Sequence, residues 1–320
     1  MSDPAPPADR PLDLLPVDIS AYTGNTAIPY VTTLDSGIAG PHLLINALTH
    51  GNEVCGAHAL DYLFRNGVTP TRGQLSLSFA NVAAYESFDA ANPGASRFVD
   101  EDFNRLWSSS VLDGATRSSE LARAKELRAL IDTVDHLLDL HSMQTPSPPL
   151  ALAGTTRKCL ALCQAMGVPQ HIVIDAGHTE GVRLRDYGYF ADEDQHHTSV
   201  LVECGQHWVA ASRDVAIEST LRFLGAFDAV DRDWLASRLG PSPDGQRAVE
   251  VTDAVTVDSA DFQFLDAYQG LEMIAQAGTA IARDGARTIV TPYNNCVLIM
   301  PTRRIKRGQT AVRFGRYVNR

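Results

Sequence analysis

The sequence carries too few basic residues for a protein that binds nucleic acid. Its 320 residues include 27 Lys and Arg against 38 Asp and Glu, which gives a formal net charge of −11 at pH 7. Neutralising a phosphate backbone requires clustered Lys and Arg, whereas this chain as a whole repels polyanions. Its one basic cluster, at residues 303–307, is short and is better explained as a solvated turn. We therefore expect no nucleic-acid partner.

Long hydrophobic runs and a cysteine framework are also missing. No segment approaches the roughly 18 consecutive apolar residues of a membrane-spanning helix. The first 16 residues include five prolines and lack the charged and apolar regions of a signal peptide, so we predict a flexible leader over residues 1–20. The five cysteines are scattered and form no CxxC pair. These absences favour a cytoplasmic protein with buried, reduced thiols and no membrane partner.

The rest of the composition is that of a globular protein with a substantial core, since 44% of the residues are hydrophobic and 20% are charged. Between residues 42 and 230, apolar runs typical of buried strands alternate with amphipathic helical segments. This alternation predicts an α/β fold with a largely parallel sheet covered by helices on both faces. We expect strands at 42–48, 75–82, 134–140, 171–175 and 199–204, and helices at 53–66, 118–131, 156–166 and 212–230.

The C-terminal part of the chain has a different sequence pattern. From residue 245 onward it consists of short β-rich runs separated by Gly, Asp and Pro turns, which predicts a small all-β domain. The boundary falls in the segment 240–245, which is rich in Gly and Pro. We therefore divide the chain into the leader at 1–20, an α/β domain at 21–240 and a β-rich domain at 245–320.

Polar residues follow two of the predicted strands at their carboxyl ends, where open α/β folds assemble ligand sites. His50 and Glu53 are three residues apart in a loop that leads into a helix, and His141 ends an otherwise apolar strand. Two His and one Glu form the ligand set of a catalytic zinc site, with the fourth position left for water. Asp139 is on the same side of its strand as His141, where it could orient the imidazole. The His50/Glu53 pair and a histidine at a strand end are each common by chance, but their joint occurrence at strand ends favours a metal site.

A carboxylate also interrupts the apolar strand at 199–204. Glu203 would be costly to bury unpaired, and partial desolvation raises its proton affinity, which suits a general base for a metal-bound water. The alternative is that Glu203 pairs with an arginine of the long polar segment 92–110. That segment contains Arg97 and Arg105, and arginine is suited to carboxylate recognition and to stabilising an oxyanion. A solvated loop position is the default for either arginine considered alone.

Other chemistries have no support in the sequence. It contains no GxGxxG, Walker A, GxSxG or HExxH motif, which argues against dinucleotide or nucleotide binding, a serine nucleophile elbow and a helical zinc-protease site. His196 and His197 are adjacent and flanked by polar residues, which indicates a surface loop rather than a metal site.

Four short motifs follow one another along the chain. They are His50-Gly-Asn-Glu53, Asp102-Phe-Asn-Arg105, Asp139-Leu-His141 and Val202-Glu203. In order and approximate spacing they resemble the succinylglutamate desuccinylase/aspartoacylase family, the deacylase branch of the zinc carboxypeptidase superfamily. The resemblance covers nearly the whole chain. It implies a carboxypeptidase-like mixed or parallel sheet with helices on both faces, followed by a small all-β domain.

The resemblance also implies roles for the catalytic residues. It makes His50, Glu53 and His141 the ligands of one Zn²⁺ per chain. Glu203 would be the general base and proton shuttle, and Arg97 would polarise the scissile carbonyl.

Substrate-binding residues follow from the same resemblance. Asn104 and Arg105 would hold the carboxylate of the amino-acid half of the substrate. Arg183 and Arg185 are candidates for the arginine that binds a second substrate carboxylate. Tyr293 either reaches the site from the β-rich domain or is a structural tyrosine.

The resulting hypothesis is a zinc-dependent hydrolase that cleaves the amide bond of a small, anionic N-acyl amino acid. A carboxypeptidase that acts on short peptides would use the same core, and a small-molecule-binding protein without catalysis is the alternative from another class. The acyl group, the metal used in the cell and any homo-oligomer stay open. Because the chain is acidic and the expected substrate is an anion, we predict a local positive pocket of zinc and arginines.

Overall fold

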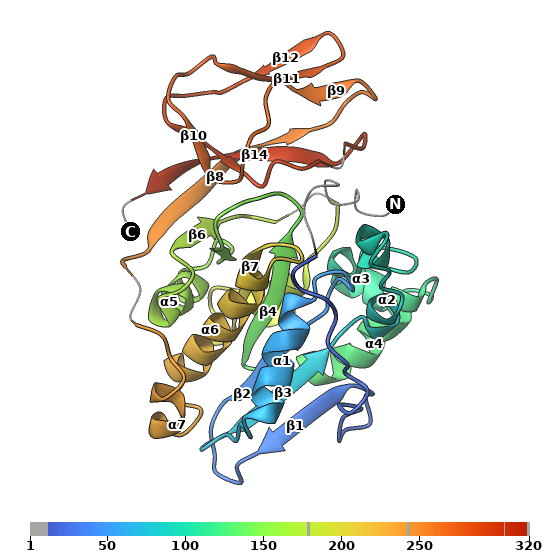
Figure 1. Ribbon diagram of the computed structural model, residues 1–320, viewed down its shortest axis with the longest axis vertical. Helices are drawn as coiled ribbons and strands as arrows, with labels where there is room; N and C mark the ends of the chain where they lie inside the picture. The colour runs from blue at the N-terminus through green and yellow to red at the C-terminus, as the bar shows by residue number, and fades with distance from the viewer. Residues whose placement is uncertain (1–11, 178–179, 242–243, 304, 319–320) are drawn as a thin grey trace.

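The fold is built around one large mixed sheet, seen in a computed structural model that describes residues 12–177, 180–241, 244–303 and 305–318 (Figure 1). Within these residues the sheet has 11 strands, and neighbouring strands in its order are hydrogen-bonded. Its first seven strands, in spatial order, are β1 (Val31–Asp35), β3 (Gln74–Phe79), β2 (His42–Ala47), β4 (His136–Met143), β7 (Thr198–Gln206), β5 (Leu150–Leu152) and β6 (His171–Ile174).

The centre of this sheet is parallel, as the sequence predicts. Strand β2 pairs in parallel with β3 and β4, and β4 pairs in parallel with β7. Side chains along β2 face opposite layers: Leu43 belongs to one apolar core and Leu44 to another, and both are buried. The sequence prediction missed β1 and β5, which are antiparallel to β3 and β7 respectively and make the sheet mixed.

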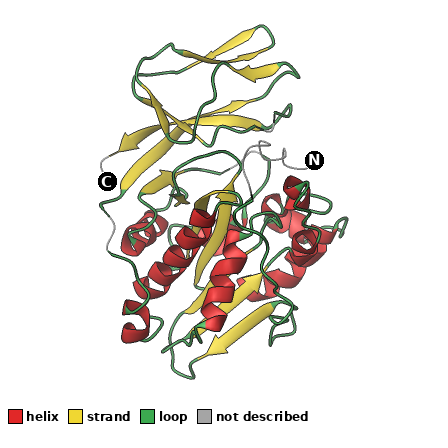
Figure 2. Cartoon of the chain, in the orientation of Figure 1, coloured by secondary structure: helices red, strands yellow, loops and turns green. Residues whose placement is uncertain are grey.

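Helices cover both faces of the sheet, which confirms the predicted layering (Figure 2). Helices α1, α5 and α6 pack into the core that contains Leu43, and α4 packs into the core that contains Leu44. Helix α4 begins after Ser118, whose hydroxyl accepts a hydrogen bond from the Leu121 amide. The helices are α1 (Cys55–Arg65), α2 (Val82–Glu86), α3 (Ser109–Leu112), α4 (Ser119–Ile131), α5 (Arg157–Met166), α6 (Ala210–Ala226) and α7 (Arg232–Ala236).

The β-rich C-terminal segment continues the main sheet. Strand β8 pairs in parallel with β6 at one end and antiparallel with β14 along its length, so hydrogen bonding crosses the boundary expected at 240–245. A separate three-stranded sheet lies beyond it, at the top of Figure 1. The separate sheet consists of β12 (Arg287–Val290), β11 (Ala280–Asp284) and β9 (Phe262–Phe264). The C-terminal strands of the main sheet are β8 (Arg247–Thr256), β14 (Thr310–Val318), β13 (Cys296–Ile299) and β10 (Glu272–Ile274).

The flexible leader predicted for residues 1–20 is not flexible from residue 12 onward, because that part packs on the protein. Residues 1–11 lie outside the described residues. From residue 12 onward the chain packs on the α/β core, since Leu14 and Ile19 are buried in the cluster that contains Leu43. The Tyr85 hydroxyl also donates a hydrogen bond to the Val17 carbonyl oxygen. Apolar burial of these side chains therefore anchors a segment that its prolines suggested was flexible.

The five cysteines are all buried and free of disulfide bonds, as expected from their apolar surroundings. Within the described ranges, no helix combines the length and the apolar character that crossing a membrane requires.

Leu14 and Leu15 form a matched pair for testing whether this segment belongs to the fold. Leu14 is 3% exposed and Leu15 is 52% exposed. Replacing Leu14 with Ala removes buried methyl groups, and we expect it to lower the free energy of unfolding by about 2–5 kcal/mol in denaturant titration. The Leu15→Ala control should change it by less than about 0.5 kcal/mol. Equal, small effects of both substitutions would contradict the packing described for residues 12–20.

Candidate metal centre and active-site cleft

The loop between β2 and α1 brings His50 and Glu53 to the carboxyl end of the sheet. It is pressed against two neighbouring segments, because a Cβ atom on Gly51 would lie 2.4 Å from the Ala84 carbonyl carbon and 2.5 Å from the Ser96 carbonyl oxygen. Glycine is therefore required at position 51, and the close approach fixes the path of the chain between the two polar residues.

Two adjacent strands supply the other polar groups. His141 on β4 is paired in register with Glu203 on β7, so both side chains project from the same face of the sheet. Asp139 lies two residues before His141 and shares that face. The register of β4 and β7 thus carries the expected metal ligand and the expected general base to the same edge.

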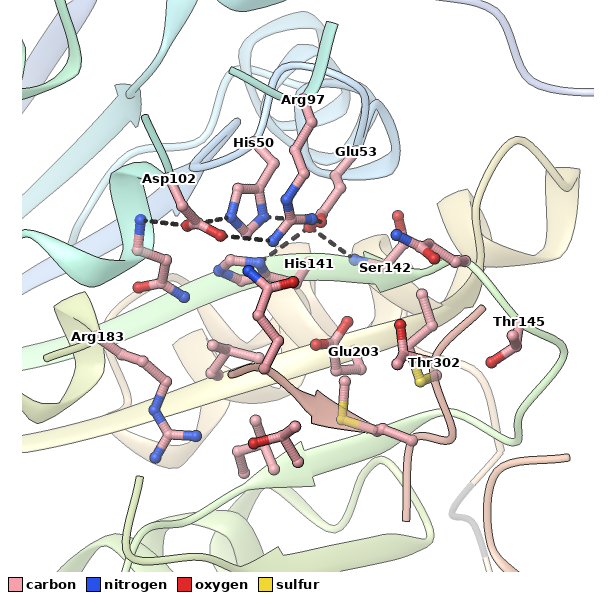
Figure 3. A pocket seen from close by; sticks show the side chains of 18 of the residues that line it. His50, Glu53, Arg97, Asp102, His141, Ser142, Thr145, Arg183, Glu203 and Thr302 are labelled. Atoms are coloured by element: carbon pink, nitrogen blue, oxygen red, sulfur yellow. Dashed lines mark hydrogen bonds and ion pairs between the residues drawn. The ribbon is translucent and has the colours of Figure 1, made fainter. Parts of the chain in front are cut away.

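His50, Glu53 and His141 converge at this edge (Figure 3). The Nδ1 atom of His50 lies 2.8 Å from Glu53 Oε1, and the Nδ1 atom of His141 lies 2.9 Å from Glu53 Oε2. One ligand atom from each residue lies within 4.8 Å of the others, and all three residues are buried. Two imidazole nitrogens and a carboxylate are a donor set that zinc accepts. The residues expected from the sequence to bind metal are therefore brought together.

Carboxylates behind the two histidines orient their rings. His141 Nε2 is 2.8 Å from Asp139 Oδ2, and His50 Nε2 is 3.1 Å from Asp102 Oδ1. The other oxygen of Asp139 accepts hydrogen bonds from the side chains of Asn46 and Thr49, each at 2.9 Å. A proton held on each Nε2 leaves the Nδ1 lone pairs directed at the shared centre, the arrangement usual around metal-bound histidine.

The electrostatics of the cluster suit a cation. Burial raises the pKa of the Glu53 carboxyl, but His50 and His141 outweigh burial and hold this pKa well below its usual range. Burial lowers the pKa of His141, but Asp139 and Glu53 outweigh it and raise this pKa well above its usual value. Buried carboxylates on two sides of one imidazole therefore favour positive charge at this position.

Glu203 stands apart from this network. Its side chain is buried, and within the described part of the chain Oε2 has no hydrogen-bond partner and no arginine forms an ion pair with it. Burial, and after it the charge of Glu53, raise the pKa of Glu203 to about 8. The pairing of Glu203 with a loop arginine, the alternative left by the sequence, is absent from these residues. A buried carboxylate without a fixed partner can take up and release a proton.

Arg97 bridges the metal-ligand group and its outer carboxylates. Its Nη1 atom donates to Glu53 Oε1 and its Nη2 atom donates to Asp102 Oδ2, both at 3.1 Å. The guanidinium therefore has a fixed position beside the converging ligands. Asn104 and Arg105 line the same cleft, with Arg105 Nε 3.8 Å from Glu180 Oε2.

Of the two arginines proposed for a second substrate carboxylate, only Arg183 lines the cleft. Its guanidinium is buried and donates to Asp175 at 3.0 Å and to Asp186 at 2.6 Å. Arg185 instead points into the protein, where it bonds the Ala153 carbonyl oxygen and Asp186. Arg183 precedes the short 3₁₀ turn Leu184–Asp186 in an extended conformation and Arg185 lies within the turn, so the two side chains leave the backbone in different directions.

Tyr293 lies away from the cleft, which corrects the expectation that it reaches the site. Its hydroxyl is 2.5 Å from Thr252 Oγ1, and the Arg316 guanidinium stacks on its ring at 3.7 Å. These contacts hold it in a separate hollow on the C-terminal strands, which also contains Arg247 and Tyr317. Packing within the β-rich segment accounts for this tyrosine.

The C-terminal segment nevertheless forms one wall of the cleft, through residues that the sequence prediction missed. Arg313 on β14 is 6% exposed, lines the cleft and lies 3.6 Å from Asp175. Met300, Pro301 and Thr302 line the same wall. No motif marks Arg313, because its place depends on β14 lying beside β8.

Charges along the cleft are nearly balanced. Among the described residues that line it, four are arginines and five are carboxylates. The arginines are Arg97, Arg105, Arg183 and Arg313, and the carboxylates are Glu53, Asp102, Asp175, Glu180 and Glu203. The predicted positive pocket therefore does not arise from side chains alone and would require the cation as well.

Comparison with known proteins identifies the family to which the chain is similar. The family model described as "Succinylglutamate desuccinylase/Aspartoacylase catalytic domain" matches residues 39–224. The human N-acyl-aromatic-L-amino acid amidohydrolase (carboxylate-forming) is 30% identical over 123 residues, which cover 36% of this chain and 37% of that protein. The match thus spans little more than a third of the curated relative.

Solved structures extend the similarity of fold to most of the chain. Succinylglutamate desuccinylase from Vibrio parahaemolyticus superposes with a TM-score of 0.66 at 17% identity, covering 90% of this chain and 86% of that one. The product-bound ectoine utilization protein EutE from Ruegeria pomeroyi gives 0.64 at 19% identity, covering 90% and 88%. At these identities the likeness shows a shared fold that includes the C-terminal strands.

Replacing Asp139 with Asn tests whether the outer carboxylate orients His141. Asparagine keeps an oxygen for Asn46 and Thr49 but removes the negative charge from His141 Nε2. We expect the Kd of the tightest zinc ion, measured by competition with a chelator, to rise about 10–100-fold.

The matched control for that experiment is Asp61→Asn. Asp61 is a mostly buried carboxylate on α1 that contacts Tyr22 and Arg65, away from the cleft. It should leave the zinc Kd unchanged. An unaltered Kd in the folded Asp139→Asn variant would show that the ligand geometry does not depend on Asp139.

Proposed function

This chain belongs to the succinylglutamate desuccinylase/aspartoacylase family, and on that premise we propose that it is a zinc-dependent hydrolase of N-acyl amino acids. The observation that carries the proposal is the position of the buried Glu203, whose Oε2 has no hydrogen-bond partner among the described residues, beside the converging His50, Glu53 and His141. A proton acceptor next to a cation site is an arrangement that can hydrolyse an unreactive amide.

The residues fit a zinc ion on chemical grounds. His50 Nδ1, His141 Nδ1 and a Glu53 oxygen would hold it, and all three residues line the cleft. When bound there, zinc supplies Lewis-acid chemistry that polarises a carbonyl oxygen and acidifies water. The hydrogen bonds that Asp139 and Asp102 accept from the two histidines support this assignment.

Glu203 acts as the general base and then as the general acid. Its carboxylate accepts a proton from water while the water oxygen bonds to the amide carbonyl carbon, and it then delivers that proton to the nitrogen as the C–N bond breaks. The products are a carboxylic acid and a free amino acid. The pKa of Glu203, about 8 beside Glu53, falls when a cation neutralises that neighbour, so the carboxylate form becomes available near neutral pH.

Arginine and amide side chains position the substrate. Arg97, fixed by Glu53 and Asp102, is placed to stabilise the negative charge that develops on the carbonyl oxygen. Asn104 and Arg105 are the groups in the cleft that would hold the carboxylate of the amino-acid half. These hydrogen bonds to fixed atoms reduce the reorganisation needed during the reaction.

The relatives support the substrate class without choosing the acyl group. The human relative is named for N-acyl aromatic amino acids and the Vibrio relative for succinylglutamate, and both names describe an amino acid with an acylated nitrogen. We propose the same class of linear amide for this protein.

Replacing Glu203 with Gln tests the proposed proton transfer. The amide has nearly the same shape but cannot accept the proton, so we expect kcat to fall by about 10²–10⁴-fold while zinc content stays the same. Glu180→Gln is the control, because it removes another carboxylate from the same cleft and should affect KM more than kcat. A Glu203→Gln variant that keeps full activity would overturn the mechanism.

A panel of amides tests the substrate class. N-acetyl and N-succinyl amino acids are compared with dipeptides of similar size, using protein of verified zinc content. We expect measurable kcat/KM for at least one N-acyl amino acid and much lower values for every dipeptide. Efficient release of a C-terminal residue from dipeptides alone would favour a carboxypeptidase.

A further inference from the structure

A second group of metal-binding side chains lies at the opposite end of the sheet from the cleft. Asp135 directly precedes β4 and His197 directly precedes β7. These parallel strands start in register, with His136 opposite Thr198, and the Thr198 amide donates to the Asp135 carbonyl oxygen at 3.0 Å. The six residue-to-residue steps from Asp135 to His141 span about 20 Å of extended chain, so the two metal groups are well separated.

The geometry of this group is close to that of a coordination site. His196 Nε2 lies 2.8 Å and His197 Nε2 lies 4.0 Å from the same oxygen, Asp135 Oδ1. One ligand atom from each of the three residues lies within 4.8 Å of the others. Ligands held about 2.0–2.2 Å from a tetrahedral zinc ion are separated by roughly 3.4 Å, so small side-chain rotations suffice.

Two of the three ligands are already held in place. Asp135 Oδ2 accepts a hydrogen bond from the His42 amide at 2.7 Å, which leaves Oδ1 directed at the histidines. The ring of His197 stacks on Tyr189 at 5.0 Å, and its side chain is 18% exposed. His196 is more open, with 67% of its side chain exposed, so an ion can reach the group from solvent.

Nearby histidines are committed to other contacts and do not compete. His136 Nδ1 lies 2.8 Å from the Thr198 hydroxyl, and its ring stacks on Phe227. His42 Nε2 lies 2.8 Å from the Ser76 hydroxyl. The group is therefore specific to Asp135 and the two consecutive histidines.

We propose that Asp135, His196 and His197 form a second divalent-metal site, for a transition ion such as Zn²⁺, distinct from the cleft. Imidazole nitrogens select Zn²⁺, Ni²⁺ or Cu²⁺ over Mg²⁺ and Ca²⁺, which prefer larger sets of oxygen ligands. The sequence alone favoured a surface loop for the two histidines, because it could not show that Asp135 lies beside them.

The local charges set the expected strength of binding. Lys158 donates to the carbonyl oxygens of Tyr189 and Gln195, so it fixes the loop that leads to the histidines. Its ammonium also opposes a second cation nearby, and the site has a single carboxylate. We therefore expect micromolar affinity, weaker than at the cleft. Bound metal would join the loop to the start of β4 and stabilise the folded state.

Metal analysis after dialysis against micromolar ZnCl₂ tests the site on the full chain. The wild type should retain one zinc ion per chain more than a His196→Ala/His197→Ala variant. Because the result is a difference, it holds whether or not the cleft contains zinc, and it is independent of the proposed function. Asp135→Asn, which keeps an oxygen for the His42 amide, should weaken the same site.

The control is His171→Ala, which removes a partly exposed histidine of β6 that belongs to neither metal group. It should retain as much zinc as the wild type. Zinc should also raise the melting temperature of the wild type more than that of the double variant, while turnover of the two remains equal. Equal zinc retention by wild type and double variant, or an equal loss in His171→Ala, would overturn the proposal.

Discussion

The buried charges at the carboxyl ends of β2 and β4 have to balance one another, and the catalytic half of the protein is organised around that constraint. Glu53 faces His50, His141 and Arg97 at hydrogen-bond distance. A buried carboxylate without such partners would cost several kcal/mol, so each group fixes the position of the next. Glu203 is the exception, since its Oε2 has no hydrogen-bond partner within the described residues. The balance thus leaves one group free for proton transfer.

The continuous sheet explains how a C-terminal segment can contribute to a cleft built mainly by the α/β part. Because β8 pairs with β6, strand β14 lies within reach of the cleft and places Arg313 near Asp175. The same continuity limits how far the two parts can move apart, since separation would break the parallel ladder. Residues of both parts line the cleft, and we therefore propose that both contribute to substrate selection, whereas the proposed chemistry belongs to the α/β part.

Short motifs at strand ends were sufficient to predict the converging ligands and the position of Glu203. His50 and Glu53 follow an apolar strand, and continuous apolar runs predict parallel strands buried on both faces, whose carboxyl ends meet at one edge of the sheet. Contacts made late in the chain were not predictable in this way. Arg313 carries no local signal, and Tyr293 is placed by stacking within the C-terminal strands. Contacts between residues that are far apart in the sequence leave no local pattern from which they could be predicted.

We propose that amide hydrolysis by this protein requires an ion held by His50, Glu53 and His141. Turnover of an N-acyl amino acid by chelator-stripped protein, followed during titration with zinc, tests this requirement. We expect no turnover without metal and recovery in proportion to the ions bound at the tighter site. Full turnover by protein shown to contain no divalent metal would contradict it.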